Sequence, residues 1–259
     1  MGRNVYLQMK RLEEARRIVV DELGALPSLA VETVPVPEAV GRVLAEPVHA
    51  ALSAPNYHAA AMDGVAVRAE TTYGASESHP RELTLGREAH FVNTGNVLPE
   101  GTDAVIMIEA VQVLGDERIC IEAPAFPWQH VRRIGEDIVA TELLFPRHHR
   151  ITPICLGALL TAGIFSVSVK RKPRVLIIPT GSELVDWRRT PLSDLKPGQV
   201  LETNSFVLGA LVESCGALFT RHPMVADEIP RITAALDSAR EEGYQIALIL
   251  GGSSAGSED

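Results

Sequence analysis

The feature that most constrains this fold is a short apolar run that breaks abruptly into a polar turn, Arg174 to Val185. Val175 to Ile178 are β-favouring residues without polar alternation, which is typical of a central parallel strand covered on both faces. The run continues through Pro179 into Thr180-Gly181-Ser182-Glu183. In an open α/β sheet the carboxyl ends of the strands form the ligand-binding edge. We therefore expect a ligand-binding turn directly after this strand.

A second unit of the same kind lies near residue 259. The apolar run Gln245 to Leu250 leads into a loop of glycine, serine and acidic residues. Between the two runs, the pattern predicts a helix from Asn204, a strand over Leu218 to Val225 and a helix from Asp227 to Arg240. The order β-α-β-α-β favours a doubly wound sheet whose first and third strands are neighbours. This topology places Thr180-Gly181 beside Gly251-Gly252.

The residues before this sheet suggest two further kinds of structure. Helical spacing predicts an amphipathic, core-forming helix over Leu7 to Leu23, a shorter one over Pro37 to Ala45 and another over Ile151 to Gly163. Short strands and turns fill the interval from Glu46 to about Ile138. We expect an α/β multidomain chain: a helical domain (1–50 and 141–172) interrupted by an all-β insertion (51–140), followed by a doubly wound α/β domain (173–259).

Within the β insertion, the sequence predicts strands at Val105–Ile108, Val111–Leu114 and Arg118–Glu122, the last two joined by a turn at Gly115-Asp116. Three turns carry polar chemistry: Met62-Asp63-Gly64, Asn93-Thr94-Gly95 and Gly135-Glu136-Asp137. Each has two interpretations, an ordinary turn or part of a site, because Asp, Asn, Thr and Gly are also the residues from which turns are built.

Composition argues against several classes of function. The formal net charge is −9, from 33 acidic and 24 basic residues, whereas a nucleic-acid binder needs a basic surface. No apolar run reaches the roughly 20 residues of a membrane span, and the first residues lack a signal-peptide core. We expect a cytoplasmic protein with no membrane or nucleic-acid partner. The three cysteines are far apart and predict neither a zinc site nor a disulfide framework.

The two glycine-containing loops favour an anionic small molecule as ligand. Glycine lets backbone amides approach a ligand closely, and serine hydroxyls such as Ser182 and Ser253 can donate hydrogen bonds to it. Carboxylates such as Glu183 and Asp259 only accept, so beside an anion they indicate a bridging divalent cation, Mg²⁺ by preference. Asp227 is either the N-cap of its helix or an acid of the pocket. The loops match neither the dinucleotide nor the P-loop motif.

Six motifs in fixed order point to one family. They are Ala61-Met62-Asp63-Gly64-Val65-Ala66-Val67, the run from Asn93 to Val105, Arg132 to Ile138, Pro179-Thr180-Gly181-Ser182-Glu183-Leu184, Pro197-Gly198-Gln199 with Asn204-Ser205, and Gly251 to Gly256. This series resembles the molybdopterin molybdenumtransferase family, the MoeA type related to the C-terminal region of gephyrin. The likeness covers nearly the whole chain, and a series of six is far more specific than any one motif.

The resemblance implies an enzyme of molybdenum cofactor biosynthesis that inserts molybdate into adenylylated molybdopterin (molybdopterin-AMP) and releases AMP, with the help of a divalent cation. It implies a homodimer whose pocket lies between the α/β domain of one subunit and the β insertion of the other. Other proteins of cofactor biosynthesis are further candidate partners. The catalytic candidates are Asp63, Thr94, Asp137 and Glu183, with Asp63 and Glu183 as metal ligands. The candidates for binding the pterin are Thr180, Gly181, Ser182, Asn204, Ser205, Asp227, Gly251, Gly252, Ser253, Ser254, Gly256 and Asp259.

This sequence departs from the family pattern in places. His58-Ala59-Ala60 stands where the family usually has Asp-Asn-Ser, and Ala140-Thr141 lies where a glycine is usual. The family also continues beyond the Gly251 loop, with lysines near the ligand and a further β domain. The resemblance therefore implies a shortened form of the family chain, in which the doubly wound, MoaB/MogA-like α/β domain (173–259) is incomplete. Two alternatives remain: a non-catalytic molybdopterin-binding or dimerisation fragment, and a nucleotide-binding α/β domain unrelated to molybdenum.

Overall fold

The computed structural model describes residues 10–24 and 28–251. Their contacts divide the chain into two compact units, one formed by residues up to Glu32 together with those from Val169 onward, the other by Thr33–Ser168. The strands β1 (Val31–Pro35) and β12 (Ser166–Lys170), in which the chain passes from one unit to the other, pair with each other. No helix in the described ranges is long and apolar enough to cross a membrane. The finer division at residues 50 and 140 stays a prediction.

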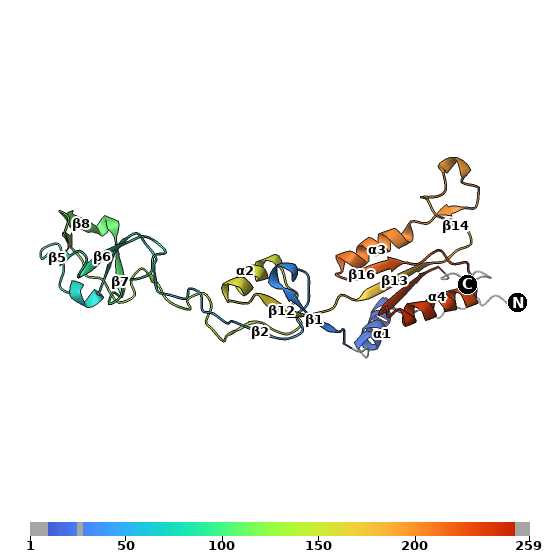
Figure 1. Cartoon of the computed structure of the whole chain (residues 1–259), viewed down its shortest axis with the longest axis horizontal. Helices are drawn as coiled ribbons and strands as arrows, with labels where there is room; N and C mark the ends of the chain where they lie inside the picture. The colour runs from blue at the N-terminus through green and yellow to red at the C-terminus, as the bar shows by residue number, and fades with distance from the viewer. Residues whose placement is uncertain (1–9, 25–27, 252–259) are drawn as a thin grey trace. The chain divides into compact units, whose positions relative to one another are not determined.

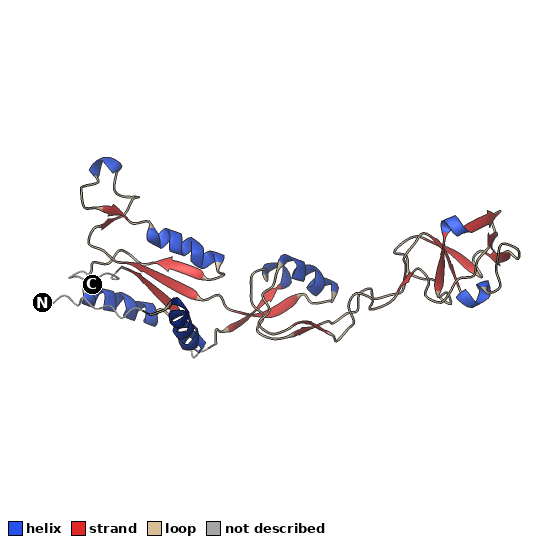
Figure 2. Cartoon of the chain, turned by 180° about the vertical axis from the view of Figure 1, so that it is seen from behind, coloured by secondary structure: helices blue, strands red, loops and turns tan. Residues whose placement is uncertain are grey.

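The unit that ends the chain contains the predicted α/β sheet. Strand β13 (Arg174–Pro179) lies between β16 (Leu218–Arg221) and β17 (Ile246–Leu250), and both pairings are parallel. Every residue of β13 after Arg174 is buried, as its continuous apolar run predicts. Helix α3 (Asn204–Ser214) covers one face of this sheet and α4 (Ile229–Glu241) covers the other (Figure 2). The predicted β-α-β-α-β order and central first strand are confirmed.

Alternate residues of β13 serve the two faces of the sheet. Leu176 and Ile178 pack with Ala235 and Ala239 of α4. On the other face Gly209 of α3 lies directly against the ring of Phe219, where a Cβ would overlap ring atoms. A short parallel pair, β14 (Leu184–Val185) with β15 (Val200–Leu201), follows β13, and the segment between them includes the 3-10 helix η4 (Leu192–Asp194).

The unit over Thr33–Ser168 is mainly β-structure, seen in the blue-to-yellow part of Figure 1. One sheet has the order β6 (Ala89–Val92), β4 (Gly64–Val67), β7 (Ala104–Met107), and a second has the order β5 (Arg81–Thr84), β9 (Arg118–Ile121), β8 (Val111–Leu114). All of these pairings are antiparallel. Val65, Val67, Leu83, Ile119 and Ile121 form the core between the two sheets. The β7, β8 and β9 predictions and the turn at Gly115 are confirmed.

Shorter elements complete this unit, and their bounds are as follows. The strands are β2 (Val48–His49), β3 (Ala59–Ala60), β10 (Val131–Arg132) and β11 (Leu143–Phe145), the 3-10 helices are η1 (Val36–Glu38), η2 (Ala69–Thr72) and η3 (Ile108–Ala110), and the α-helix is α2 (Pro153–Thr161). Strand β2 pairs with β11, and β3 pairs with β10. The helix predicted over Ile151 to Gly163 is confirmed.

Three local predictions were wrong. The helix expected over Pro37 to Ala45 is only the 3-10 turn η1, because Gly41 has a φ of +79° and the backbone then pairs with residues 149–151. Helix α1 (Leu12–Gly24) forms, but it buries no residue, so it is not a core element within the described part of the chain; residues 7–9 of that prediction lie outside the described ranges. Asp227 does not cap α4, whose N-cap is Glu228, because Pro230 occupies the first turn and the helix begins at Ile229.

Candidate functional site

In the β-rich unit, the three polar turns predicted from the sequence gather around strand β3. Ala60 accepts a hydrogen bond from the Gly95 N–H (2.8 Å) and donates one to the Asn96 carbonyl (3.0 Å). On its other side Ala60 pairs with Val131, directly before Arg132. The Asp137 N–H donates to the carbonyl of Ala54 (2.9 Å), which ties the third turn to the same segment. Residues 54–60, which include β3, therefore bond to the second and third turns and lead directly into the first, at residues 62–64.

Asp63 and Thr94 are in direct contact. The backbone N–H and the side-chain hydroxyl of Thr94 both donate to Oδ1 of Asp63, at 2.6 and 2.9 Å. These two bonds hold the pKa of the Asp63 carboxyl below its usual value, because they favour the charged form. The second oxygen, Oδ2, makes no hydrogen bond within the described residues and faces solvent as a charged, oriented acceptor.

Asp137 belongs to a surface ion-pair cluster. Its Oδ2 accepts a hydrogen bond from the Arg132 guanidinium at 2.6 Å, and Glu136 lies 3.5 Å from the same group. The bond to Asp137 and the charge of that carboxylate raise the pKa of Arg132. The Asp137 carboxylate is therefore neutralised locally, whereas Asp63 has no basic partner in the described part of the chain.

A tight backbone approach fixes the position of Asp63. The next residue, Gly64, faces strand β7 so closely that a Cβ would overlap the carbonyl oxygen of Ile106. Ile108 N–H also donates to the carbonyl of Asp63 (3.0 Å). Glycine is the one residue that lets β4 and β7 approach in this way, and Asp63 is held at the end of the sheet as a result.

We expect Gly64→Ala to lower the free energy of unfolding by about 2–3 kcal/mol, because the methyl group meets a backbone oxygen that cannot rotate away. Thermal unfolding followed by circular dichroism measures the change. Gly157→Ala in α2 is the control: nothing lies within 4 Å of its Cβ position, so the substitution is expected to stabilise the chain by about 0.5–1 kcal/mol. Equal effects of the two substitutions would contradict this account.

A second prediction concerns the pKa of Asp63. Thr94→Val removes the hydroxyl and keeps the backbone N–H, so the carboxylate loses one of two bonds that favour its charged form. We expect the Asp63 pKa to rise toward that of a free aspartate and to stay below it. Carboxyl carbon chemical shifts across a pH titration measure this. An unchanged pKa would show that the hydroxyl contributes nothing to the charge at this position.

In the α/β unit, the predicted loops meet at the carboxyl edge of the sheet. Thr180 donates to the carbonyl of Leu250 through both its N–H (3.0 Å) and its hydroxyl (2.8 Å). A Cβ on Gly251 would overlap the Thr180 hydroxyl, so the two loops lie in contact as predicted. The Gly181 N–H donates to the carbonyl of Val225 (3.1 Å), which places residues 226 and 227 beside the same turn.

The polar side chains at this edge differ in how far they are free to contact a ligand. The Glu183 carboxylate folds over Gly181, so that a Cβ on Gly181 would lie 2.7 Å from both carboxylate oxygens. Ser182, Asn204 and Asp227 are exposed, and their side chains make no hydrogen bond among the described residues. Gly181 has a φ of +144°, a conformation that favours glycine. The predicted residues Gly252, Ser253, Ser254, Gly256 and Asp259 lie outside the described residues.

Ser205 is fully buried, in a network that the sequence analysis missed. Glu202, 2% exposed, accepts hydrogen bonds from the Ser205 N–H (2.8 Å) and hydroxyl (2.6 Å). Arg221 donates to Glu202 from Nη2 (2.9 Å) and to the Ser205 hydroxyl from Nε (2.8 Å). Burial raises the pKa of Glu202, but these bonds and the Arg221 charge outweigh it, and the pKa lies below its usual value. A ligand contact by Ser205 stays a prediction.

A cavity of about 470 Å³ lies beside this network, lined by residues that include Asp186, Arg188, Arg189, Arg221 and Met224. Arg188 pairs with Asp186 (3.1 Å) and lowers the pKa of that carboxyl through its hydrogen bonds. Arg221 is paired with Glu202. In the sequence, the charged run Asp186-Trp187-Arg188-Arg189 marks this cavity, but it is not among the predicted site residues.

No cluster of three or more metal-ligating side chains exists among residues 10–24 and 28–251. Asp63 and Glu183, the predicted metal ligands, belong to different units and each offers a single exposed carboxylate. Carboxylate oxygens are suitable donors for Mg²⁺, which keeps several waters and takes few protein ligands. Each carboxylate therefore has the chemistry of a Mg²⁺ ligand, and the metal assignment stays a prediction.

Comparison with known proteins defines the class of this chain. Residues 10–163 match the family described as the MoeA N-terminal region (domain I and II), and residues 176–259 match a probable molybdopterin binding domain. The chain is 34% identical to molybdopterin molybdenumtransferase 2 of Mycobacterium tuberculosis (strain ATCC 25618 / H37Rv), with 96% of this chain and 63% of that protein covered. It is 30% identical to the molybdopterin molybdenumtransferase of Haemophilus influenzae, with 97% and 63% covered.

The fold agrees with a solved relative. The molybdopterin biosynthesis moeA protein from Pyrococcus horikoshii OT3 superposes with a TM-score of 0.82 at 35% identity, covering 93% of this chain and 66% of that one. The chain belongs to the MoeA family. It spans a little under two thirds of the length of these relatives.

Proposed function

We propose that this protein inserts molybdate into adenylylated molybdopterin and releases AMP. The proposal is carried by one observation: the motifs that mark the family form two sets of exposed polar groups, each held by backbone pairing. Asp63 with Thr94 is the first set. Ser182 and Glu183, in the loop that Thr180 fixes against Leu250 and Gly251, are the second. The relatives named molybdopterin molybdenumtransferase support the assignment.

In this proposal the two sets come from different subunits of a homodimer. The α/β loops bind the pterin and its phosphate groups through backbone N–H groups and Ser182, and Asn204 and Asp227 bind polar groups of the ligand. The acids need a cation to tolerate an anionic substrate, since carboxylates repel phosphate and molybdate. Asp63 and Glu183 would hold a divalent cation such as Mg²⁺, which when bound neutralises charge on phosphate and molybdate oxygens.

The chain's own residues would orient the reactants. Thr94 keeps Asp63 charged and fixes one of its oxygens, so the other points outward as a ligand or acceptor. Arg132 donates to Oδ2 of Asp137 at 2.6 Å and fixes the orientation of that carboxylate. Placing two anionic reactants in fixed geometry is the main contribution a protein can make to such a transfer.

The proposal is tested by incubating the purified chain with molybdopterin-AMP, molybdate and Mg²⁺, and measuring AMP. AMP release that requires both molybdate and the cation is the expected result. A chain that binds molybdopterin-AMP tightly in calorimetry and releases no AMP would refute the catalytic proposal.

That second outcome would favour a binding fragment. One observation supports this alternative: the family matched over residues 176–259 is described as a molybdopterin binding domain, and the chain covers 63% of its enzymatic relatives. Calorimetry separates the two, because a fragment binds without turnover. Binding of ATP without binding of molybdopterin would support neither.

A further inference from the structure

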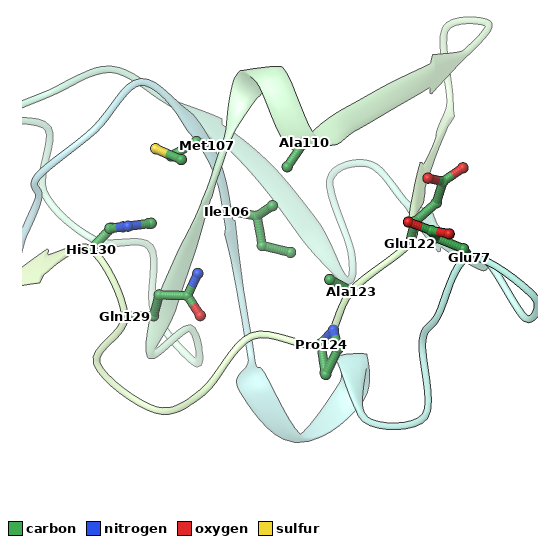
Figure 3. A pocket seen from close by; sticks show the side chains of 9 residues that line it. All are labelled: Glu77, Ile106, Met107, Ala110, Glu122, Ala123, Pro124, Gln129 and His130. Atoms are coloured by element: carbon green, nitrogen blue, oxygen red, sulfur yellow. The ribbon is translucent and has the colours of Figure 1, made fainter.

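A pocket of the β-rich unit lies outside the three polar turns and has no role in the proposed reaction. Its volume is about 310 Å³, at the low end of the range for ligand cavities. Figure 3 shows Glu77 and Glu122 at one end, Gln129 and His130 at the other, and Ile106 and Met107 between them. The pocket therefore combines an acidic end, an apolar middle and a polar end.

One wall of this pocket is a strand edge. Ile108 N–H bonds to the carbonyl of Asp63, so Gly64 and Met107 form a pair without mutual hydrogen bonds in the β4–β7 ladder. The N–H and C=O of Met107 therefore point away from β4, toward the pocket. The carbonyl of Met107 begins the 3-10 helix η3, whereas its N–H has no hydrogen-bond partner within the described residues.

Val105, two residues before Met107 on the same strand edge, already has hydrogen-bond partners there. Val105 N–H donates to the carbonyl of Gln129 (2.9 Å). The Val105 carbonyl lies 3.1 Å from Nδ1 of His130, which must carry the proton because a carbonyl only accepts. The chain thus covers the edge at Val105 with its own residues 129 and 130, and leaves it open at Met107.

The acidic end is also open. Glu77 and Glu122 are exposed, and neither forms a salt bridge in the described parts of the chain. Two unpaired carboxylates favour a positively charged group, and an open strand edge favours an extended backbone. The net charge of −9 adds a general attraction for a basic partner.

We propose that this pocket is a docking site for a short extended segment of a basic partner protein. A backbone carbonyl of the segment accepts a hydrogen bond from the N–H of Met107. One apolar side chain packs on Ile106 and Met107, and a lysine or arginine two residues away along the segment reaches Glu77 and Glu122, because alternate side chains of a strand lie on one face. This inference is independent of the proposed reaction.

The first test selects peptides. A phage-displayed library of random nine-residue peptides is panned on the complete chain. Enriched sequences should carry lysine or arginine two positions from an apolar residue. Enrichment of acidic peptides, or of none above the level on an unrelated protein, would overturn the proposal.

The second test measures affinity of the best selected peptide by fluorescence anisotropy. The double variant Glu77→Lys/Glu122→Lys should weaken binding at least about tenfold, because attraction becomes repulsion. Asp116→Lys/Glu117→Lys, in the turn between β8 and β9, makes the same change in net charge away from the pocket and should change affinity by less than about twofold. Equal losses in the two variants would show unspecific attraction and reject the site.

The third test locates the contact. Hydrogen exchange of the Met107 amide should slow when the peptide binds, and an unchanged rate would reject pairing at this strand edge. Sedimentation of the free chain over a range of concentrations tests the competing occupant. Self-association that is lost in Glu77→Lys/Glu122→Lys would assign the pocket to a second copy and overturn the proposal.

Discussion

Asp63→Asn is expected to slow molybdate-dependent AMP release at least about a hundredfold, the size of effect seen when one preorganised charged or hydrogen-bonding group is removed from an active site. The substitution is conservative in shape. Oδ1 of asparagine can still accept both hydrogen bonds from Thr94, at 2.6 and 2.9 Å in the parent chain. What disappears is the negative charge, which the Thr94 bonds otherwise favour by lowering the pKa.

The control for this prediction is Asp116→Asn, which removes an exposed carboxylate from the turn between β8 and β9 on the same unit. It should leave AMP release and thermal unfolding unchanged. Both variants should keep the parent circular dichroism spectrum. AMP release by Asp63→Asn at the rate of the parent chain would remove Asp63 from the proposed site and leave the family assignment intact.

The sheet of the α/β unit was predicted correctly because its strands have continuous apolar sequences. The apolar runs at Val175–Ile178 and Ile246–Leu250 have no polar alternation, and both form parallel strands at the centre of the α/β unit or beside it. The Gly115 turn joins two paired strands as expected. The prediction of a helix over Pro37 to Ala45 was wrong because apolar spacing carries no information on pairing with distant residues. Gly41 takes a positive φ, and the Leu44 N–H bonds to the carbonyl of His149 instead of to a helical partner.

The candidate site was predictable in part for the same reason. The order of motifs identified Asp63, Thr94 and the Gly181 turn, but only the fold shows that residues 54–60 connect the three turns of the β-rich unit. Glu202 gave no signal, because a lone acid is ordinary until the fold brings Arg221 to it from 19 residues away. Whether Asp63 and Glu183 share one cation in a dimer stays a prediction.

Glu202→Ala should produce the largest loss of stability, about 3–5 kcal/mol, because it leaves the partly buried Arg221 without its carboxylate partner. The Glu202 side chain is 2% exposed and that of Arg221 is 16% exposed. The carboxylate also accepts the Ser205 N–H, one of the unpaired donors at the start of α3 (2.8 Å). The substitution therefore affects both the helix start and the strand β16 that carries Arg221.

Urea unfolding measures this loss in the free energy of unfolding, provided that the tryptophan fluorescence followed comes from the α/β unit alone. The chain has two tryptophans, and in a Trp128→Phe background Trp187, 5.9 Å from the Phe206 ring, reports on that unit. Glu228→Ala is the control, since its pair with Arg231 is exposed and should contribute less than about 1 kcal/mol. A loss from Glu202→Ala no larger than that of the control would contradict the buried pair's role.

The pH dependence gives an independent check. The folded-state pKa of Glu202 is lowered, so its contribution is complete above the pKa of an unfolded glutamate, about 4.3, and is lost as the pH falls through the folded value. The parent chain should lose stability steeply below about pH 4, where Glu202→Gln, which has no proton to take up, should lose less. If the free energy of unfolding of the two proteins fell identically with pH, the negative charge of Glu202 would contribute nothing to stability. Ser205 and Arg221 would then need only a hydrogen-bond acceptor at this position.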